Sequence, residues 1–285
     1  TTGNGSIGYP YLTIQGAINK ITTPNQTIIV SPGIYTESIL FTQNDTTIIG
    51  QQGSGGQQAV ILTRTNSNIV DFGVTSRCVI TNCNIQLTAG ASAIYAIKIG
   101  VSGSGKVRFG RTETICTTGG ILAGIGYSDG GELTFAHGKI FQTNNVVGVG
   151  TETKAAFRVA AGGSINLLDV KTIDVNSDGL SNYSVVATDG GTSGKILIRR
   201  SGISIDDDNA NHTGLLYLTG TNLEHETEYN TIDINEETTN AGQGCVICNP
   251  SGTIKLHSCF NHMHVGHITG TAYFSVLSST SEITS

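Results

Sequence analysis

The chain has 285 residues, including 38 Gly; only 13% of its residues are charged, and its formal net charge is −6. This charge, with no basic cluster larger than Arg199-Arg200, indicates that nucleic acid is not a partner. No run of about 18 apolar residues is present, so no membrane-spanning segment is predicted.

The amino-terminal region contains the best helix candidate, within residues 9–21. Thr13 is a suitable N-cap residue for this helix. An approximate i, i+3, i+4 pattern gives it one apolar side, formed by Leu12, Ile14, Ala17, Ile18 and Ile21. Strands are then predicted at Thr27–Val30 and Thr46–Ile49, with a Pro32-Gly33 turn between them.

The succession YLTIQGAINKI, TIIVSPGIYTESI and DTTIIG resembles the first turn of right-handed parallel β-helix proteins of the pectin-lyase-like superfamily, particularly pectin methylesterases. The resemblance covers residues 1–50. It implies that the helix caps the open end of the solenoid and that the V-x-P-G-x-Y-x-E segment forms the first rung.

The resemblance does not extend to the methylesterase motifs, which carry two aspartates and an arginine. Val70-Asp71-Phe72-Gly73 matches the first motif only in part, and a chain without Trp cannot complete the second. The calcium and arginine site of pectate lyases has no counterpart either. We therefore expect no methylesterase activity.

Beyond residue 50, a short apolar run, a Gly-rich turn and a second apolar run recur at least six times. Strands this short bury an apolar face only by stacking on neighbouring copies. We therefore predict an all-β chain that forms a right-handed parallel β-helix with a short N-terminal capping helix. The alternative is an antiparallel sandwich, because Asp-Gly-Gly and Ser-Gly-Ser-Gly can also close hairpins.

One continuous domain is expected, with a cap and first rung at 1–50, rungs at 51–270 and a C-terminal cap or oligomerisation segment at 271–285. Projecting loops are expected at Asp206–Asn211 and Glu224–Asn230. We align the rungs on one residue each that is expected to point inward. Successive residues of this alignment are 21 to 34 positions apart, in the order Ile99, Ile125, Val159, Val186, Leu216, Ile247 and Ile268.

Two groups of carboxylates are the catalytic candidates, because glycoside hydrolysis needs two carboxyl groups beside the scissile bond. They are Asp206, Asp207 and Asp208, and Glu224, Glu226 and Glu228. Acidic runs are also typical of solvated loops. Asp206–Asn211 is a further candidate for calcium, but it lacks the Gly and the closing Glu of an EF-hand.

The metal candidates lie near the carboxyl terminus, where zinc-type ligands occur at Cys245, Cys248, Cys259, His262 and His264. Residues three apart on a strand point to opposite faces, so Cys-Val-Ile-Cys also fits an ordinary buried strand. His262-x-His264 alone resembles, in position and residue type, the pair that rings a metal, such as iron, in trimeric viral spikes. Otherwise we expect no cofactor.

Two functions remain open. The first is a non-catalytic structural or attachment protein on a virion or cell surface, of fibre or tailspike character, a homotrimer with a possible glycan ligand. The second is a polysaccharide-degrading enzyme, a tailspike-like glycoside hydrolase or lyase. The trimer is expected from the partly apolar segment Ala272–Ser285. Because the chain begins at Thr1 rather than Met, we expect a fragment or a processed product.

Overall fold

The computed structural model describes most of the chain, and for several strands it describes the backbone alone. The described residues are 3–56, 58–65, 67–72, 77–89, 95–99, 105–111, 113–118, 124–144, 154–176, 183–188, 193–207, 213–220, 223–236, 244–250, 254–259, 261–265 and 272–276. Among these residues there is no helix long and apolar enough to cross a membrane.

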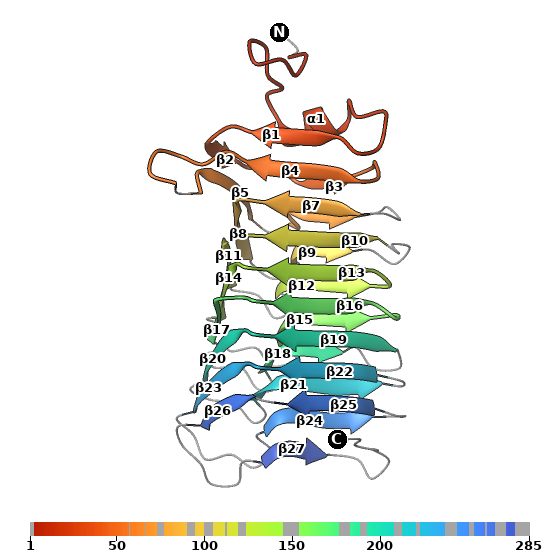
Figure 1. Cartoon of the computed structure of the whole chain (residues 1–285), viewed down its shortest axis with the longest axis vertical. Coiled ribbons are helices and arrows are strands. Elements are labelled where there is room, and N and C mark those ends of the chain that lie inside the picture. The colour runs from red at the N-terminus through yellow and green to blue at the C-terminus, as the bar shows by residue number, and fades with distance from the viewer. Residues whose placement is uncertain are drawn as a thin grey trace.

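Twenty-seven short strands form three sheets of nine, which run along the length of the molecule (Figure 1). The first sheet contains β1 (Thr27–Val30), β4 (Thr46–Gly50), β7 (Cys78–Thr81), β10 (Lys106–Gly110), β13 (Glu132–Ala136), β16 (Ser164–Leu168), β19 (Gly194–Arg199), β22 (Leu223–Glu228) and β25 (Ile254–Cys259). The second contains β2 (Gly33–Tyr35), β5 (Val60–Thr65), β8 (Cys83–Ala89), β11 (Glu113–Thr118), β14 (Lys139–Asn144), β17 (Thr172–Asn176), β20 (Gly202–Asp207), β23 (Thr231–Glu236) and β26 (His262–Val265). The third contains β3 (Ile39–Phe41), β6 (Val70–Phe72), β9 (Tyr95–Ile99), β12 (Gly124–Asp129), β15 (Lys154–Ala160), β18 (Tyr183–Thr188), β21 (Thr213–Gly220), β24 (Gly244–Pro250) and β27 (Ala272–Val276).

Neighbouring strands in all three sheets are parallel, and each strand pairs with the strand three elements later in the chain. The predicted β-solenoid is therefore confirmed, and the antiparallel sandwich is wrong. The division at residues 50 and 270 stays a prediction.

The rungs are more regular than the sequence alignment indicated. Successive register partners in the third sheet are 27 to 31 residues apart, in the order Val70, Ile97, Gly126, Phe157, Val186, Leu216, Val246 and Phe274. The pairing of Val186 with Leu216 is as expected. Ile247 is instead the partner of Tyr217, one position out of the expected line, because adjacent apolar residues hide the register in the sequence.

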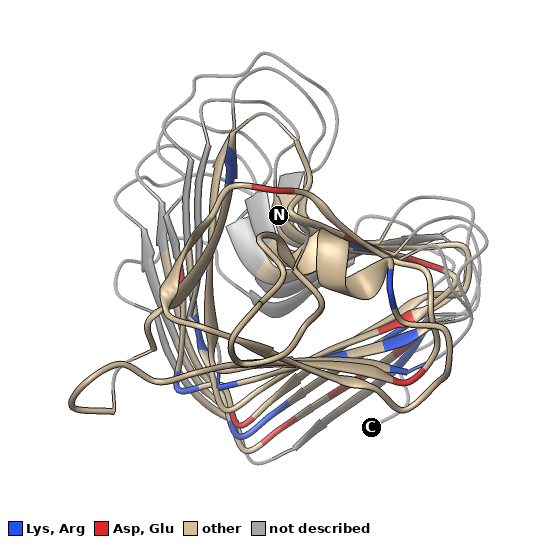
Figure 2. Cartoon of the chain, turned by 90° about the horizontal axis from the view of Figure 1, so that it is seen from above, with Lys and Arg blue, Asp and Glu red and all other residues tan. Residues whose placement is uncertain are grey.

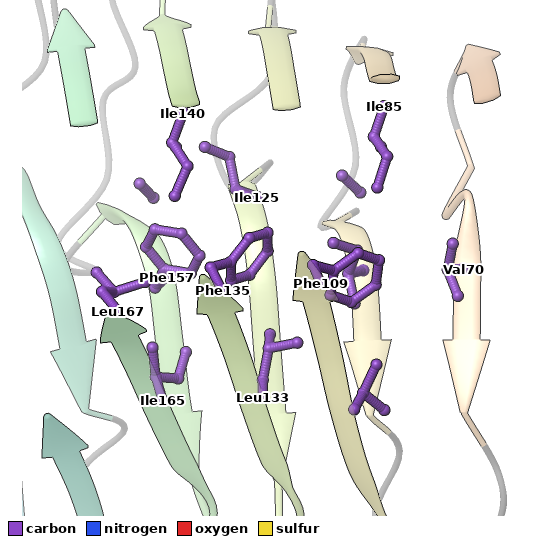
Figure 3. Packing of buried hydrophobic residues seen from close by; sticks show 14 of the residues in the cluster. Val70, Ile85, Phe109, Ile125, Leu133, Phe135, Ile140, Phe157, Ile165 and Leu167 are labelled. Atoms are coloured by element: carbon purple, nitrogen blue, oxygen red, sulfur yellow. The ribbon is translucent and has the colours of Figure 1, made fainter. Parts of the chain in front are cut away.

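Aliphatic and aromatic side chains from the three sheets fill the interior. Phe109 and Phe135 are register partners on neighbouring strands of the first sheet, with ring centroids 5.2 Å apart, and the Phe157 ring of the third sheet lies 5.3 Å from that of Phe135 (Figure 3). Gly126 leaves room for this row, because a Cβ there would lie 2.8 Å from the Phe157 ring. Burial of this continuous core is the main stabilising contribution of each added rung.

The capping helix is shorter than predicted. Helix α1 comprises Ile14–Ile18 and buries only its two terminal isoleucines against the core, whereas Leu12 is 84% exposed. The predicted N-cap is confirmed, because the Thr13 hydroxyl accepts a hydrogen bond from the Gly16 N–H at 2.9 Å. Figure 2 shows α1 lying over part of the open end of the solenoid, where it adds Ile14 and Ile18 to the core.

The corner between the first and second sheets is tight and repeats along the molecule. At each of six successive corners one non-glycine residue has a left-handed backbone with φ between 48° and 57°, namely Asn82, Arg111, His137, Asp169, Arg200 and Tyr229. At the first five of these corners the N–H of this residue donates to a carbonyl of the next rung, as from Arg200 to Glu228 at 3.0 Å. The hydrogen-bond ladder therefore continues around the corner, which offsets the cost of the left-handed conformation.

Candidate functional site

The three candidate glutamates lie on a strand, not in the projecting loop that the sequence predicted. They alternate along β22 with the buried residues His225 and Thr227. Because successive side chains of a strand point to opposite faces, Glu224, Glu226 and Glu228 share the outer face of the first sheet. We call these three residues the glutamate face. The alternation of charged and less polar residues in Leu-Glu-His-Glu-Thr-Glu was the signal for this strand.

Cationic side chains of the two neighbouring strands pair with the glutamate face. Lys195 forms a salt bridge with Glu224, and Arg199 of the same strand forms one with Glu226. Arg199 Nε also lies 3.1 Å from Glu228 Oε2. On the other side, His257 Nε2 of β25 lies 3.3 Å from Glu228 Oε1. In Figure 2 the positions of Lys or Arg and of Asp or Glu recur along the strands of the first sheet.

These pairs bear directly on the predicted acid catalysis. The hydrogen bond from Lys195, with its positive charge, lowers the pKa of Glu224. A general acid that protonates a glycosidic oxygen needs the opposite change, a pKa raised toward neutral pH. Glu224 is therefore arranged as an ion-pair partner of a lysine rather than as a general acid.

The aspartates lie in a different sheet from the glutamate face. Asp206 and Asp207 end β20 in the second sheet, where Asp206 pairs in register with Asn176 and Asn235. Asp208 lies outside the described residues. The described backbone therefore places the two groups of carboxylates on different sheets, and Asp206 and Asp207 belong to a strand rather than to the expected loop.

The five metal candidates are distributed over three strands of three different sheets. Cys245 and Cys248 belong to β24, Cys259 to β25, and His262 and His264 to β26. Only the exposed His262 has a described side chain. In the part of the chain whose side chains are described, no group of three His, Cys, Asp or Glu residues is placed to hold a metal. The zinc or iron site stays a prediction.

A second surface, which the sequence analysis did not find, lies on the outer face of the third sheet. Asp71, Lys98, Tyr127 and Arg158 occupy equivalent register positions on β6, β9, β12 and β15. All four are partly exposed, although buried residues flank them on both sides. Adjacent strands are about 4.8 Å apart, so the four side chains form one straight line, the third-sheet column.

Two neighbouring side chains order the centre of the third-sheet column. The Tyr95 ring, 5% exposed, stacks on the Tyr127 ring with their centroids 5.1 Å apart. Lys98 Nζ lies 5.9 Å from the centroid of the Tyr127 ring, within the range of a cation–π contact. At the end of the column, Asn68 Nδ2 donates to Asp71 Oδ1 at 3.0 Å.

The chemistry of the third-sheet column suits a carbohydrate. An aromatic face offers apolar area to the C–H side of a sugar ring, while its edge remains polar. Lys98 and Arg158 are the cations that form charge-assisted hydrogen bonds with carboxylates. The sequence signal was a single polar residue inside an apolar run, as in Ile-Lys-Ile and Phe-Arg-Val, but it required the correct register.

The chain matches no family model, and no curated protein has a significantly similar sequence. It is similar in structure to a pectin methylesterase from carrot, with 15% identity, a TM-score of 0.47 and coverage of 96% of this chain and 87% of that chain. A pectin methylesterase from Yersinia enterocolitica has 10% identity, a TM-score of 0.48 and coverage of 94% and 95%. The A-module of a mannuronan C-5 epimerase from Azotobacter vinelandii has 10% identity, a TM-score of 0.32 and coverage of 93% of this chain and 94% of that chain. Pectin methylesterases, which the sequence resemblance named, are thus among the structures to which the chain is similar.

Proposed function

We propose that this chain is a non-catalytic attachment protein that binds an acidic polysaccharide along the outer face of its third sheet. The observation that carries this proposal is the third-sheet column, in which Lys98 and Arg158 lie on either side of Tyr127. The two cations are two rungs apart, about 10 Å by strand spacing. A linear polymer with regularly spaced carboxylates matches such an arrangement better than a compact ligand does.

The setting of this function is part of the same proposal. Low charge, a surface rich in Thr, Asn and Gly, and the segment Ala272–Ser285 favour a homotrimer on a virion or cell surface. These features agree with an attachment role, since such a protein needs a stiff body and a repeated weak contact. Several identical columns on one particle increase the overall affinity through effective concentration.

A polysaccharide-degrading enzyme is the second candidate, and one observation favours it. Glu226 and Glu228 share one face and both contact Arg199, so two carboxylates lie close together. Hydrolysis requires such a pair, but one member must be protonated at the working pH. Glu224 is unsuited to that protonated role because Lys195 lowers its pKa, and binding without cleavage is therefore our first proposal.

Binding to an unesterified polyuronate, with neutral dextran as the comparison, tests the first proposal. We expect Lys98→Ala and Arg158→Ala each to weaken polyuronate binding about tenfold, because each removes a charge-assisted contact worth roughly 1.5 kcal/mol. Tyr127→Ala is expected to weaken it by a similar factor through lost stacking. Calorimetric titration at two salt concentrations measures these changes.

The matched control is Arg108→Ala, which removes an exposed cation from the outer side of the first sheet. It should leave polyuronate binding within about twofold of the original value, the usual scale for a distant surface change. Equal losses for Arg108→Ala and Arg158→Ala would show unspecific charge attraction and overturn the proposal.

The same polyuronate samples distinguish the second candidate. We expect no new reducing ends after incubation with the protein. If reducing ends accumulate and Glu226→Gln or Glu228→Gln abolishes their formation, the protein is an enzyme and the first proposal is wrong.

A further inference from the structure

His225 is buried in the interior of the solenoid. It is 4% exposed and lies on the inner face of β22, between Glu224 and Glu226 of the outer face. Its register partners are Ile196 of β19 and Leu256 of β25. An imidazole therefore occupies a position that belongs to aliphatic side chains in the preceding rung.

No described side chain is placed to stabilise a positive charge on the imidazole. Neither ring nitrogen has a hydrogen-bond partner of acceptable geometry among the described residues. The buried side chains that the other strands around this rung direct inward are uncharged: Ile196 and Ile198 of β19, Leu216 and Leu218 of β21, and Ile232 of β23. A carboxylate that could stabilise a proton on His225 is thus missing from this described set.

The charged and titratable side chains described on β19 and β25, and the glutamates of β22, lie on the opposite face. They are Glu224, Glu226 and Glu228 of β22 itself, Lys195 and Arg199 of β19, and Lys255 and His257 of β25. Cys248 of β24 is the register partner of the buried Leu218. The side chain of Cys248 lies outside the described set. Among the described residues, only the backbone of Ile196 offsets part of the cost of charging this buried imidazole.

We propose that the rung formed by β22 and β23 opens reversibly in mild acid, and that His225 is the group that triggers the opening. Mild acid would then act as a switch on the carboxyl-terminal rungs of the molecule, with the amino-terminal rungs left intact. The hydrogen bonds of Asn230 to Ile198 and Asn261 tie this rung to both neighbours, so its opening would loosen them as well.

The direction of the effect follows from the protonation of the two states. Burial lowers the pKa of His225 from 6.5 to about 3, and the backbone of Ile196 offsets this only in part. Neutral His225 therefore contributes its full stability above pH 6.5, and this contribution falls as the pH drops from 6.5 toward 3. The population of the opened rung rises about tenfold for each pH unit in that window.

Hydrogen exchange with mass spectrometry at pH 7.5 and pH 5.0, corrected for the intrinsic exchange rates, tests the proposal on the full chain. We expect the protection of amides in β22 and β23 to fall about thirtyfold between pH 7.5 and pH 5.0. This factor corresponds to tenfold per pH unit over the 1.5 units between pH 6.5 and pH 5.0. Amides of β13 and β14 are the internal reference and should keep their protection. A window ending at pH 5.0 avoids titration of Glu224, whose pKa is lowered from 4.5.

His225→Leu should remove the acid response, because an aliphatic side chain at this position has no proton to bind. His257→Gln is the matched control and should keep the response, since His257 is an exposed histidine of the adjacent strand. If His225→Leu does not fold, His225→Gln serves as the second neutral variant. Protection that does not depend on pH in the original protein, or an unchanged acid response in both neutral variants, would overturn the proposal.

Discussion

Asn230 and Asn261 continue the tight corners of the solenoid with hydrogen bonds made by their side chains. Asn230 Oδ1 accepts from the Ser201 N–H at 2.9 Å, and Asn261 Oδ1 accepts from the Asn230 N–H at 3.0 Å. The amide nitrogen of Asn230 also donates to the Ile198 carbonyl at 2.9 Å. Backbone groups buried at the corner are thereby satisfied by side chains from the next rung, which avoids a large desolvation cost.

Replacing Asn230 by Ala should destabilise the chain strongly. The Asn230 side chain is 1% exposed, and its loss leaves the Ser201 N–H and the Ile198 carbonyl without these partners. We expect a fall of about 2–4 kcal/mol in the free energy of unfolding, measured by urea denaturation.

Asn166→Ala is the control for this prediction, because Asn166 makes one side-chain hydrogen bond, to Thr134, in a half-exposed position. Its cost should stay below about 1 kcal/mol. Similar values for the two variants would show that the corner asparagine has no special role.

At the scale of single residues, the sequence predicted residue types better than roles. The glutamates were found, but their roles depend on Lys195 and Arg199, about 30 positions earlier in the chain and adjacent only through the register. The third-sheet column was missed for the same reason, because its residues are also adjacent only through the strand register. Asn230 was not recognised because its neighbours in sequence do not distinguish it from the many surface asparagines of this chain.

The first structural element, α1, is attached by two side chains whose roles the sequence motif did not reveal. The Glu37 carboxylate accepts from the N–H groups of Ile14 and Gln15 at 2.8 and 2.9 Å, so it satisfies the free amino-terminal end of the helix. The Gln15 side chain accepts from the Leu40 N–H at 2.6 Å and donates to the Leu40 carbonyl at 3.2 Å. It therefore substitutes for a missing neighbour of the edge strand β3.

Glu37→Ala should detach the helix without unfolding the rungs. We expect a loss of about 1–2 kcal/mol, as for other helix-capping groups, and faster hydrogen exchange confined to α1 and β3. Gln26→Ala, which removes an exposed side-chain contact with Thr23, should leave both unchanged. Exchange that accelerates equally in β19 would contradict a local role for Glu37.

At the scale of elements, the sequence predicted β1, β4 and most of the rung strands correctly, because short apolar runs bounded by turn residues are a local signal. It failed at β22, where alternating glutamates were interpreted as a loop. The charges there are tolerated on a strand because cations of β19 neutralise them, and this compensation comes from a distant part of the chain.

The whole molecule is a stack of nearly equal rungs, and this regularity gives it two long surfaces of different character. The outer face of the first sheet carries mutually paired charges, whereas the third-sheet column presents an aromatic ring between two cations. The fold class was predictable because each repeat shows the same apolar pattern. The surfaces were not, since a shift of one residue in register places a side chain on the opposite face.

Light scattering coupled to size-exclusion chromatography, on a mixture of the protein and a long polyuronate, tests the central claim most directly. The account predicts that protein and polymer elute together and that the mass of the polymer stays constant during the incubation. A polymer that becomes shorter, or a protein that elutes separately at every ratio, would contradict it.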